Sequence, residues 1–335
     1  MSASRHRVVV TQRFFDEATI AYLEDNGCEV AIVDLAPGTA DGDLSHDQLV
    51  HLLADADGWI VGHARVTRAL LEALPRLQII SRRGVGYERV DLDAARDLGR
   101  VVAIGAGGND ASVADHTIGM MLAIAKRLRE SQANMQAGKW SILTGSDLYE
   151  KTVGVIGLGR IGKSLVKRLG GFDARVLAVT ADPDPAYAAA TGVEYVDLDR
   201  LLAESDYISL HAPLTAETRY LINAEALARM KPGAILINAA RGGLVQDADL
   251  LEALRSGHLA GAGLDVFVSE SDPAFMEVTN ALLALPNVVA TPHAAASSRE
   301  GLNRTNRIAA ESVVAVLSGG EPAPGCVVAD GRTGR

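Results

Sequence analysis

A chain of 335 residues with 48% hydrophobic and 22% charged residues has the length of about two domains and the composition of a folded protein. Its 32 Lys and Arg residues stand against 42 Asp and Glu, and the net charge of −10 disfavours nucleic acid and anionic membrane surfaces as partners. The sequence has no apolar run of about 18 residues, which predicts no membrane span, and no secretory pattern at its start, which predicts a cytoplasmic protein.

The two cysteines, Cys28 and Cys326, are far apart and belong to no CxxC pattern. Their spacing predicts neither a disulfide framework nor a metal site.

From residue 7 onward, short runs rich in Val and Ile alternate with helical patterns, which is typical of parallel βαβ units. The expected strands of this first region are residues 8–10, 29–33, 59–61, 78–81 and 101–104. The expected helices are residues 16–26, 47–54, 67–74 and 91–97. An unusually long helix, residues 112–138, is expected next, because apolar residues continue at helical spacing throughout it.

A second βα series begins at Thr152. Its expected strands are residues 153–156, 175–179, 194–196, 207–211, 234–238, 262–266 and 288–290. Its expected helices are residues 161–170, 198–204, 224–230 and 248–256. An amphipathic helix over 297–318 follows, and the tail 319–335, rich in Gly and Pro, is expected to be loosely ordered.

The first chemical signal is Gly157-Leu158-Gly159-Arg160-Ile161-Gly162, which follows an expected strand and opens an expected helix. In that context GxGxxG predicts a dinucleotide site. Gly157 allows a tight turn, Gly159 lets the backbone approach a pyrophosphate, and Gly162 lets helix and strand pack closely. The helix amides, including those of Arg160 and Ile161, then face the phosphates.

An acid that reads the ribose is expected about 20 residues after such a motif, where this chain has Thr180. Asp182 and Asp184 follow closely, and no Lys or Arg lies between residues 176 and 191. Because carboxylates repel a 2′-phosphate, this pattern favours NAD over NADP. The alternative is that residues 182–185 form only a solvated turn and that another segment sets the ribose preference.

Several motifs in a fixed order resemble the D-isomer-specific 2-hydroxyacid dehydrogenase family, over roughly residues 8–318. They are Arg83-Gly84-Val85-Gly86, Val113-Ala114-Asp115-His116, the Gly157–Gly162 motif, His211-Ala212-Pro213-Leu214-Thr215, Asn238-Ala239-Ala240-Arg241-Gly242, Gly263-Leu264-Asp265-Val266-Phe267 and Thr291-Pro292-His293.

The resemblance implies an α/β protein with two doubly wound parallel-sheet domains. A Rossmann NAD-binding domain, residues 105–294, would be inserted into a discontinuous flavodoxin-like substrate domain formed by residues 1–104 and 295–335.

Hydride exchange with a 2-keto acid needs a cation for the carboxylate, an acid for the developing alkoxide and a partner for that acid. Arg241, after an expected strand, can grip a carboxylate with two parallel hydrogen bonds. His293 follows a short apolar run and fits the acid. Glu270 lies five residues after Asp265, the spacing that the family uses for its catalytic Glu, with Glu277 as the alternative.

Other positions take cofactor-binding roles only through the resemblance. Asp265 matches the residue near the nicotinamide carboxamide, and His211, Pro213 and Thr218 match the loop over the cofactor. Ala239 matches the segment before Arg241, and Arg241 and His293 themselves are expected to border the cofactor.

Val85 and Gly86 resemble the loop whose amides hold the substrate carboxylate. Arg82 and Arg83 stand just before it, and strand alternation lets at most one of them face the ligand. If one does, the substrate could carry a second anionic group, as 3-phosphoglycerate does. If both are surface residues, glyoxylate or hydroxypyruvate is favoured.

The expected activity is therefore an NAD-dependent D-2-hydroxyacid dehydrogenase acting on a small anionic 2-hydroxy or 2-keto acid, in a homodimer built on the 112–138 helix. Two alternatives stay open: a glyoxylate/hydroxypyruvate reductase, and a non-enzymatic NAD(H)-sensing corepressor that binds other proteins.

Overall fold

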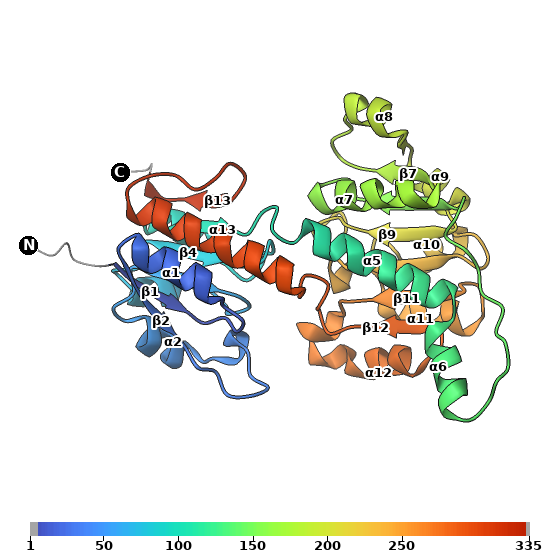
Figure 1. Ribbon diagram of the computed structural model, residues 1–335, viewed down its shortest axis with the longest axis horizontal. Coiled ribbons are helices and arrows are strands. Elements are labelled where there is room, and N and C mark those ends of the chain that lie inside the picture. Colours follow the sequence, from blue (N-terminus) through green and yellow to red (C-terminus); the bar gives the residue numbers. More distant parts are fainter. Residues whose placement is uncertain (1–5, 333–335) are drawn as a thin grey trace, which may run out of the picture. The chain divides into compact units, whose positions relative to one another are not determined.

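The protein was analysed as a computed structural model that describes residues 6–332, drawn in Figure 1. The chain divides into two compact units. Unit 2 is Asp110–Ser297, and unit 1 comprises the remaining described residues, 6–109 and 298–332. Unit 1 is therefore assembled from two stretches of chain that unit 2 separates in sequence.

Unit 1 holds a six-stranded sheet, as far as residues 6–332 show, in the order β13-β5-β4-β3-β1-β2. Its strands are β1 (His6–Val10), β2 (Cys28–Ile32), β3 (Gly58–Val61), β4 (Ile79–Arg82), β5 (Val101–Ile104) and β13 (Val327–Asp330). Its α-helices are α1 (Glu17–Asp25), α2 (His46–Leu53), α3 (Arg68–Ala73), α4 (Leu92–Asp97) and α13 (Arg299–Leu317), and a short 3-10 helix, η1, spans Asp41–Asp43.

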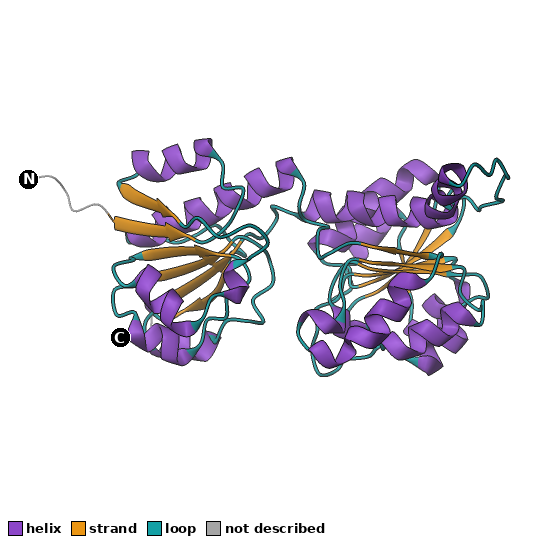
Figure 2. Ribbon diagram, turned by 90° about the horizontal axis from the view of Figure 1, so that it is seen from below, coloured by secondary structure: helices purple, strands orange, loops and turns teal. Residues whose placement is uncertain are grey.

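All neighbouring strands of this sheet are parallel except β13, which pairs antiparallel with β5. Helices cover both faces, as Figure 2 shows, and each face has its own apolar core. The chain passes from β1 to its neighbour β2 and then crosses to β3 on the other side of β1, so the winding reverses between β1 and β3. In open α/β sheets, ligands bind at the carboxyl ends of the strands beside such a reversal.

Unit 2 holds a seven-stranded sheet, over the described residues, in the order β12-β11-β10-β9-β6-β7-β8, with every pairing parallel. Its strands are β6 (Thr152–Ile156), β7 (Arg175–Val179), β8 (Glu194–Tyr195), β9 (Tyr207–Leu210), β10 (Ile235–Asn238), β11 (Gly261–Leu264) and β12 (Val288–Ala290). Its α-helices are α5 (Asp110–Ala125), α6 (Leu128–Gln136), α7 (Arg160–Leu169), α8 (Pro185–Thr191), α9 (Leu198–Glu204), α10 (Ala224–Arg229), α11 (Asp247–Arg255) and α12 (Met276–Ala284). Short 3-10 helices are η2 (Gly170–Phe172), η3 (Gly242–Leu244), η4 (Val268–Glu270) and η5 (Pro273–Phe275).

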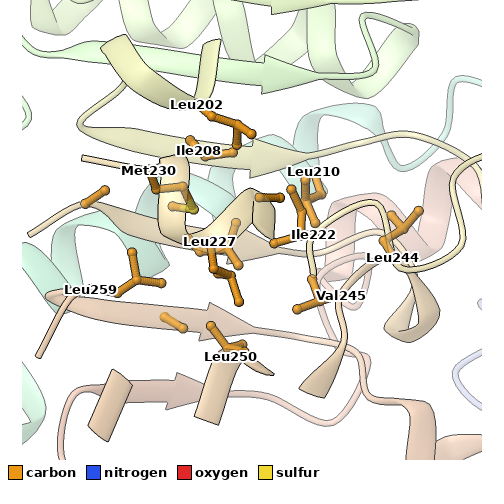
Figure 3. Packing of buried hydrophobic residues seen from close by; sticks show 14 of the residues in the cluster. Leu202, Ile208, Leu210, Ile222, Leu227, Met230, Leu244, Val245, Leu250 and Leu259 are labelled. Atoms are coloured by element: carbon orange, nitrogen blue, oxygen red, sulfur yellow. The ribbon is translucent and has the colours of Figure 1, made fainter. Parts of the chain in front are cut away.

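One face of this sheet is packed by a large apolar cluster, shown in Figure 3. Ile208 and Leu210 of β9 contribute to it, together with Leu227 of α10 and Leu250 of α11. Full burial of such a side chain contributes roughly 1.5–3 kcal/mol relative to exposure. This face therefore fixes the strands whose carboxyl ends carry the candidate site. The winding of unit 2 reverses between β6 and β9.

The predicted fold class, an α/β protein with two wound sheets, is confirmed. The prediction of one long helix over residues 112–138 is wrong, because Arg127 adopts a left-handed φ of 52° and separates α5 from α6. The Arg127 guanidinium donates to Glu130 one turn into α6, which holds this break in place.

The tail was also predicted wrongly, because its strand β13 extends the sheet of unit 1 instead of lying loosely. The sequence pattern also missed α8 and α12. No helix among residues 6–332 is long and apolar enough to cross a membrane. Cys28 and Cys326 are buried free thiols.

Candidate active site

The Gly157–Gly162 motif forms the turn between β6 and α7, at the carboxyl end of a central strand of unit 2. Gly157 has a φ of +95°, and a Cβ there would lie 2.6 Å from the backbone nitrogen of Ala212. A Cβ on Gly162 would lie 2.4 Å from the carbonyl oxygen of Gly157. Only glycine fits at these two positions, because the turn is pressed against both the 211–212 backbone and its own helix.

Gly159 differs from these two glycines, since a Cβ there would meet nothing within 4 Å. It is the N-cap of α7, and no side chain caps the helix. The helix therefore begins at a position with open space beside it, followed by exposed Arg160 and half-buried Ile161. An uncapped helix N-terminus beside open space suits the pyrophosphate of a dinucleotide, so these residues fit NAD.

The ribose side of the site follows β7. Thr180 is half-buried directly after the strand, and Asp182 is exposed. Asp184 caps α8 by accepting from the Tyr187 amide, 3.0 Å away, which lowers the pKa of its carboxyl. Lys163 of α7 lies 3.5 Å from Asp184, so a cation does reach this region. The sequence analysis considered only residues 176–191 for such a cation, and Lys163 lies outside that range.

His211 follows β9 with a buried ring. Its Nε2 lies 2.9 Å from the Ser209 hydroxyl, and burial lowers its pKa to about 4. The lowered pKa favours the neutral ring near pH 7, and the role of His211 beside the cofactor stays a prediction. In the following loop, Thr218 donates to the carbonyl oxygen of Pro213 at 2.7 Å and thereby closes the turn.

His293 and Glu270 form a hydrogen-bonded pair. His293 Nδ1 lies 2.8 Å from Glu270 Oε2, and the side chains are 40% and 38% exposed. The second carboxylate oxygen of Glu270 accepts from the Phe267 amide at 2.7 Å, which orients the carboxylate. Nδ1 faces the carboxylate, which fixes the orientation of the imidazole ring.

The His293 backbone has a left-handed φ of 53°, a conformation that non-glycine residues adopt only when their surroundings hold it. The buried carboxylate of Asp265 stabilises this conformation. It accepts hydrogen bonds from the Thr291 hydroxyl at 2.5 Å and from the backbone amides of Ala294 and Ala295 at 2.7 and 2.9 Å. The His293 amide itself donates to the Asp265 carbonyl at 2.8 Å. Asp265 thus positions the loop that carries His293, and its contact with a nicotinamide stays a prediction.

Arg241 lies in the turn after β10 and is half-buried, with Nη1 donating to the Ala240 carbonyl at 2.7 Å. Asn238 closes that turn, because its side chain donates to the Arg241 carbonyl and accepts from the Ala240 amide. The half-buried Ala239 lies within the turn. A Cβ on Gly242 would lie 2.3 Å from the Phe267 carbonyl carbon, so the turns bearing Arg241 and Glu270 pack directly together.

Of the substrate-binding residues predicted from sequence, Arg241 and His293 belong to unit 2, and the other four, Arg82, Arg83, Val85 and Gly86, belong to unit 1. Arg82 is the last residue of β4 and is only 6% exposed, whereas Arg83, directly after the strand, is half-buried. Arg83 Nη1 donates to the Arg13 carbonyl at 2.5 Å. Val85 and Gly86 follow in a half-buried turn.

Unit 2 thus brings together Arg241, Glu270 and His293, the three residues that the sequence analysis proposed for chemistry. Sequence reasoning missed Lys163 at the ribose side and the loop-holding role of Asp265. The signal for Lys163 was its place one turn into the helix of the glycine motif. No group of three or more His, Cys, Asp or Glu side chains arranged for a metal ion occurs among residues 6–332.

The fold and this site define a dinucleotide-binding α/β protein with a paired imidazole and carboxylate beside the cofactor cradle. Residues 118–295, more than half of the chain, match the family model described as "D-isomer specific 2-hydroxyacid dehydrogenase, NAD binding domain". The chain belongs to the D-isomer specific 2-hydroxyacid dehydrogenase family. The prediction of NAD as the cofactor is confirmed by the NAD binding domain.

Three relatives show how far the similarity extends. D-3-phosphoglycerate dehydrogenase of Mycobacterium leprae is 41% identical over 318 residues, which cover 94% of this chain and 57% of the relative. The chain therefore spans little more than half of that protein's length. Hydroxypyruvate reductase of Thermotoga maritima is 39% identical over 305 residues and is matched over 95% of its length, with 90% of this chain covered. The TT0316 protein of Thermus thermophilus superimposes with a TM-score of 0.84 at 37% identity, over 96% of this chain and 99% of that structure.

Proposed function

We propose that this protein is an NAD-dependent D-2-hydroxyacid dehydrogenase that interconverts a small 2-hydroxy acid and its 2-keto acid. The observation that carries the proposal is the 2.8 Å contact between His293 and Glu270 in the unit that also holds the glycine cradle. Family membership supports it, and so does the match to hydroxypyruvate reductase of Thermotoga maritima along nearly its whole length.

In this proposal the bound nicotinamide supplies or accepts the hydride. His293 Nε2 donates the proton to the alkoxide that develops as a 2-keto acid is reduced, and removes it in the reverse direction. Glu270 holds Nδ1 and stabilises the imidazolium. Arg241 binds the substrate carboxylate with two parallel hydrogen bonds and so orients the keto group.

The proposed cofactor-binding residues all belong to unit 2. The first turn of α7 receives the pyrophosphate, and Thr180 and Asp182 lie beside the ribose. His211, Pro213, Thr218 and Ala239 line the cofactor from neighbouring strand ends, and Asp265 holds the His293 loop against it. For Val85 and Gly86, which belong to unit 1, contact with the substrate stays a prediction.

A rate measurement on His293→Ala tests the assignment. Loss of a general acid lowers turnover by about 10²–10⁴-fold, so NADH oxidation with hydroxypyruvate should fall by that factor while the dissociation constant for NADH hardly changes. His258→Ala is the matched control, since the His258 ring lies 3.0 Å from the Leu227 carbonyl oxygen and outside the proposed site. Equal turnover in His293→Ala and the control would remove His293 from the mechanism.

We also propose that the protein is a homodimer. Large apolar side chains are exposed on α6 and the segment after it: Leu128 is 54% exposed, Met135 47%, Trp140 81% and Ile142 96%. Such a patch is typical of a surface that a second subunit covers. Light scattering gives the molecular mass directly, and a monomer mass would refute the dimer.

A further inference from the structure

Asp247 is the first residue of α11 and lies between two segments of the large apolar cluster of unit 2. Leu244 and Val245 precede it, Leu250 follows three residues later, and all three are buried in that cluster (Figure 3). Asp247 is 3% exposed and accepts a hydrogen bond from the Val268 backbone amide, while its Oδ2 has no hydrogen-bond partner among residues 6–332. Buried apolar residues therefore fix Asp247 from both sides along the chain.

The stability of the fold does not account for an acid at this position. Burial raises the pKa of the Asp247 carboxyl to about 6, because the ionised side chain is less favourable inside the protein than in water. A buried oxygen without a hydrogen bond lowers the stability further. A buried acid that costs stability and lies beside a candidate active site points to a role in that site.

The Val268 amide belongs to a peptide unit that three residues hold. This unit joins Phe267 to Val268, the first residue of η4. Asp247 accepts from its N–H, and the Glu270 amide donates to its carbonyl oxygen at 3.3 Å. Gly242 packs directly against it, since a Cβ there would lie 2.3 Å from the carbonyl carbon and 2.6 Å from the nitrogen of the unit. These contacts together fix the orientation of the peptide unit.

The orientation of this backbone sets the direction of the Glu270 carboxylate. Glu270 Oε1 accepts from the Phe267 amide at 2.7 Å, and Oε2 lies 2.8 Å from His293 Nδ1. The amides of Phe267 and Val268 are consecutive, and each is accepted by a different carboxylate. Without the Asp247 acceptor the Val268 amide would be buried and unpaired, and a rotation that relieves this would also turn the Phe267 amide and the carboxylate bound to it.

We propose that Asp247 is a positioning residue of this site, which holds the backbone of η4 so that Glu270 stays aligned with His293. A misplacement of about 1 Å at a reacting group can lower a rate by about 10²-fold. The effect of Asp247 on turnover rests on the proposed dehydrogenase function, whereas its effect on the pair of Glu270 and His293 does not.

The first test compares two substitutions with the same branching. Asp247→Leu fills the space without an acceptor, whereas Asp247→Asn keeps an oxygen for the Val268 amide. With hydroxypyruvate and NADH, kcat should fall by about 10–100-fold in Asp247→Leu and stay within about threefold in Asp247→Asn. The dissociation constant for NADH, measured by fluorescence titration, should change by about twofold or less in both. Equal kcat in the two variants, or a fall of about tenfold or more in Asp247→Asn, would overturn the proposal.

Asp249→Leu is the matched control. Asp249 lies on the same helix and also accepts from a backbone amide, that of Ala224 at 2.8 Å, but this amide opens α10 and not η4. Its loss should therefore leave kcat within about threefold of the unmodified protein. A fall in kcat as large as in Asp247→Leu would assign the effect to a general loosening of α11 and contradict the proposal.

A double-mutant cycle separates positioning of Glu270 from a general structural role. Glu270→Gln removes the charge that the Asp247 contact is proposed to align. If Asp247 acts through Glu270, adding Asp247→Leu to Glu270→Gln should lower kcat by only about threefold or less. A fall by the same factor in both backgrounds would show that the two residues act independently, and would overturn the proposal.

The last measurement does not depend on turnover. Labelling histidine with nitrogen-15 gives the chemical shift of His293 Nδ1, whose signal is identified by its absence from His293→Ala. This shift reports the hydrogen bond to Glu270, so Asp247→Leu should change it as Glu270→Gln does, and Asp247→Asn should not.

An unchanged shift in Asp247→Leu would overturn the proposal. Absence of turnover in the unmodified protein, together with a changed shift in Asp247→Leu, would refute the dehydrogenase function and retain the positioning role. If Asp247→Leu does not fold, Asp247→Ala replaces it in each comparison, and the result for Asp247→Asn can still overturn the proposal.

Discussion

The sheets of both units reverse their winding beside the first strand of each unit, but different groups lie at the strand ends of the two reversals. In unit 2 the end of β6 leads into Gly159, where a Cβ would meet nothing within 4 Å, and into a helix that no side chain caps. In unit 1 the ends of β1 and β3 close around the buried carboxylate of Asp41. The same topology thus yields an open anion site in one unit and an internally filled one in the other.

The difference shows that topology locates a crevice, whereas the side chains at the strand ends decide whether it binds. Backbone amides gathered at strand ends need an acceptor, because leaving them buried and unpaired costs about 1–3 kcal/mol each. A bound cofactor can supply that acceptor, and so can an acidic side chain from a neighbouring loop. Adding an acidic side chain at the helix N-terminus in unit 2, and altering the buried acid in unit 1, tests this difference between the units.

The largest effect is expected from Gly159→Asp, which gives unit 2 the internal anion of unit 1. A carboxylate at the N-cap would occupy the α7 amides and repel the pyrophosphate, so the dissociation constant for NADH should rise by about 10²–10³-fold. The free energy of unfolding should not fall, because a Cβ at this position meets no atom within 4 Å. Asp is also a preferred N-cap residue and stabilises a helix by about 0.5 kcal/mol or less relative to Gly. Fluorescence titration with NADH and thermal unfolding measure both quantities.

Two controls separate charge from bulk in this experiment. Gly159→Ala adds a methyl group at the same place, and Gly171→Asp adds the same charge at the opposite end of α7, where a Cβ also meets nothing within 4 Å. Cofactor affinity that falls equally in Gly159→Ala would assign the effect to bulk. An unaffected affinity in Gly159→Asp would show that α7 does not receive the pyrophosphate.

Sequence reasoning predicted the open crevice because a glycine motif between strand and helix is local: its requirements lie within six consecutive residues. The His293–Glu270 pair was also predictable, although 23 residues separate its members. His293 was identified by its place after a short apolar run and Pro292, and Glu270 by its spacing from Asp265 in the family resemblance. Arg127 was missed, since a left-handed φ in an apolar helical pattern leaves no mark in the spacing of apolar residues.

Asp41 could not have been predicted in the same way. Asp41-Gly42-Asp43 reads as a solvated turn, and its burial depends on donors 21 to 30 residues away in the sequence. Their convergence is a property of the sheet order, which places β1 beside β3. Arg82 and Arg83 were predicted as candidate anion binders, whereas Arg82 is buried and the charge of the buried Asp41 acts on Arg83.

The last prediction compares two buried carboxylates, Asp41 with four hydrogen-bond donors and Asp247 of α11 with the Val268 amide. Asp247 is 3% exposed, its Oδ2 has no hydrogen-bond partner, and burial raises its pKa to about 6. Asp41→Asn should destabilise the protein by about 2–3 kcal/mol, because an NH₂ group would face backbone and side-chain donors. Asp247→Asn should instead stabilise it at pH 8 by about 1–2 kcal/mol.

The sign for Asp247 follows from linkage. The folded-state pKa of Asp247 is raised above the unfolded value of 3.8. The contribution of Asp247 to the free energy of unfolding is therefore fully present below about pH 3.8 and is lost as the pH rises to about 6. Asn removes that loss, so the stabilisation by Asp247→Asn should be present at pH 8 and absent at pH 4. Urea unfolding at both pH values measures it. A loss of stability in Asp247→Asn at pH 8 would mean that the Val268 contact needs the ionised form, and that both units depend on satisfied buried carboxylates in the same way.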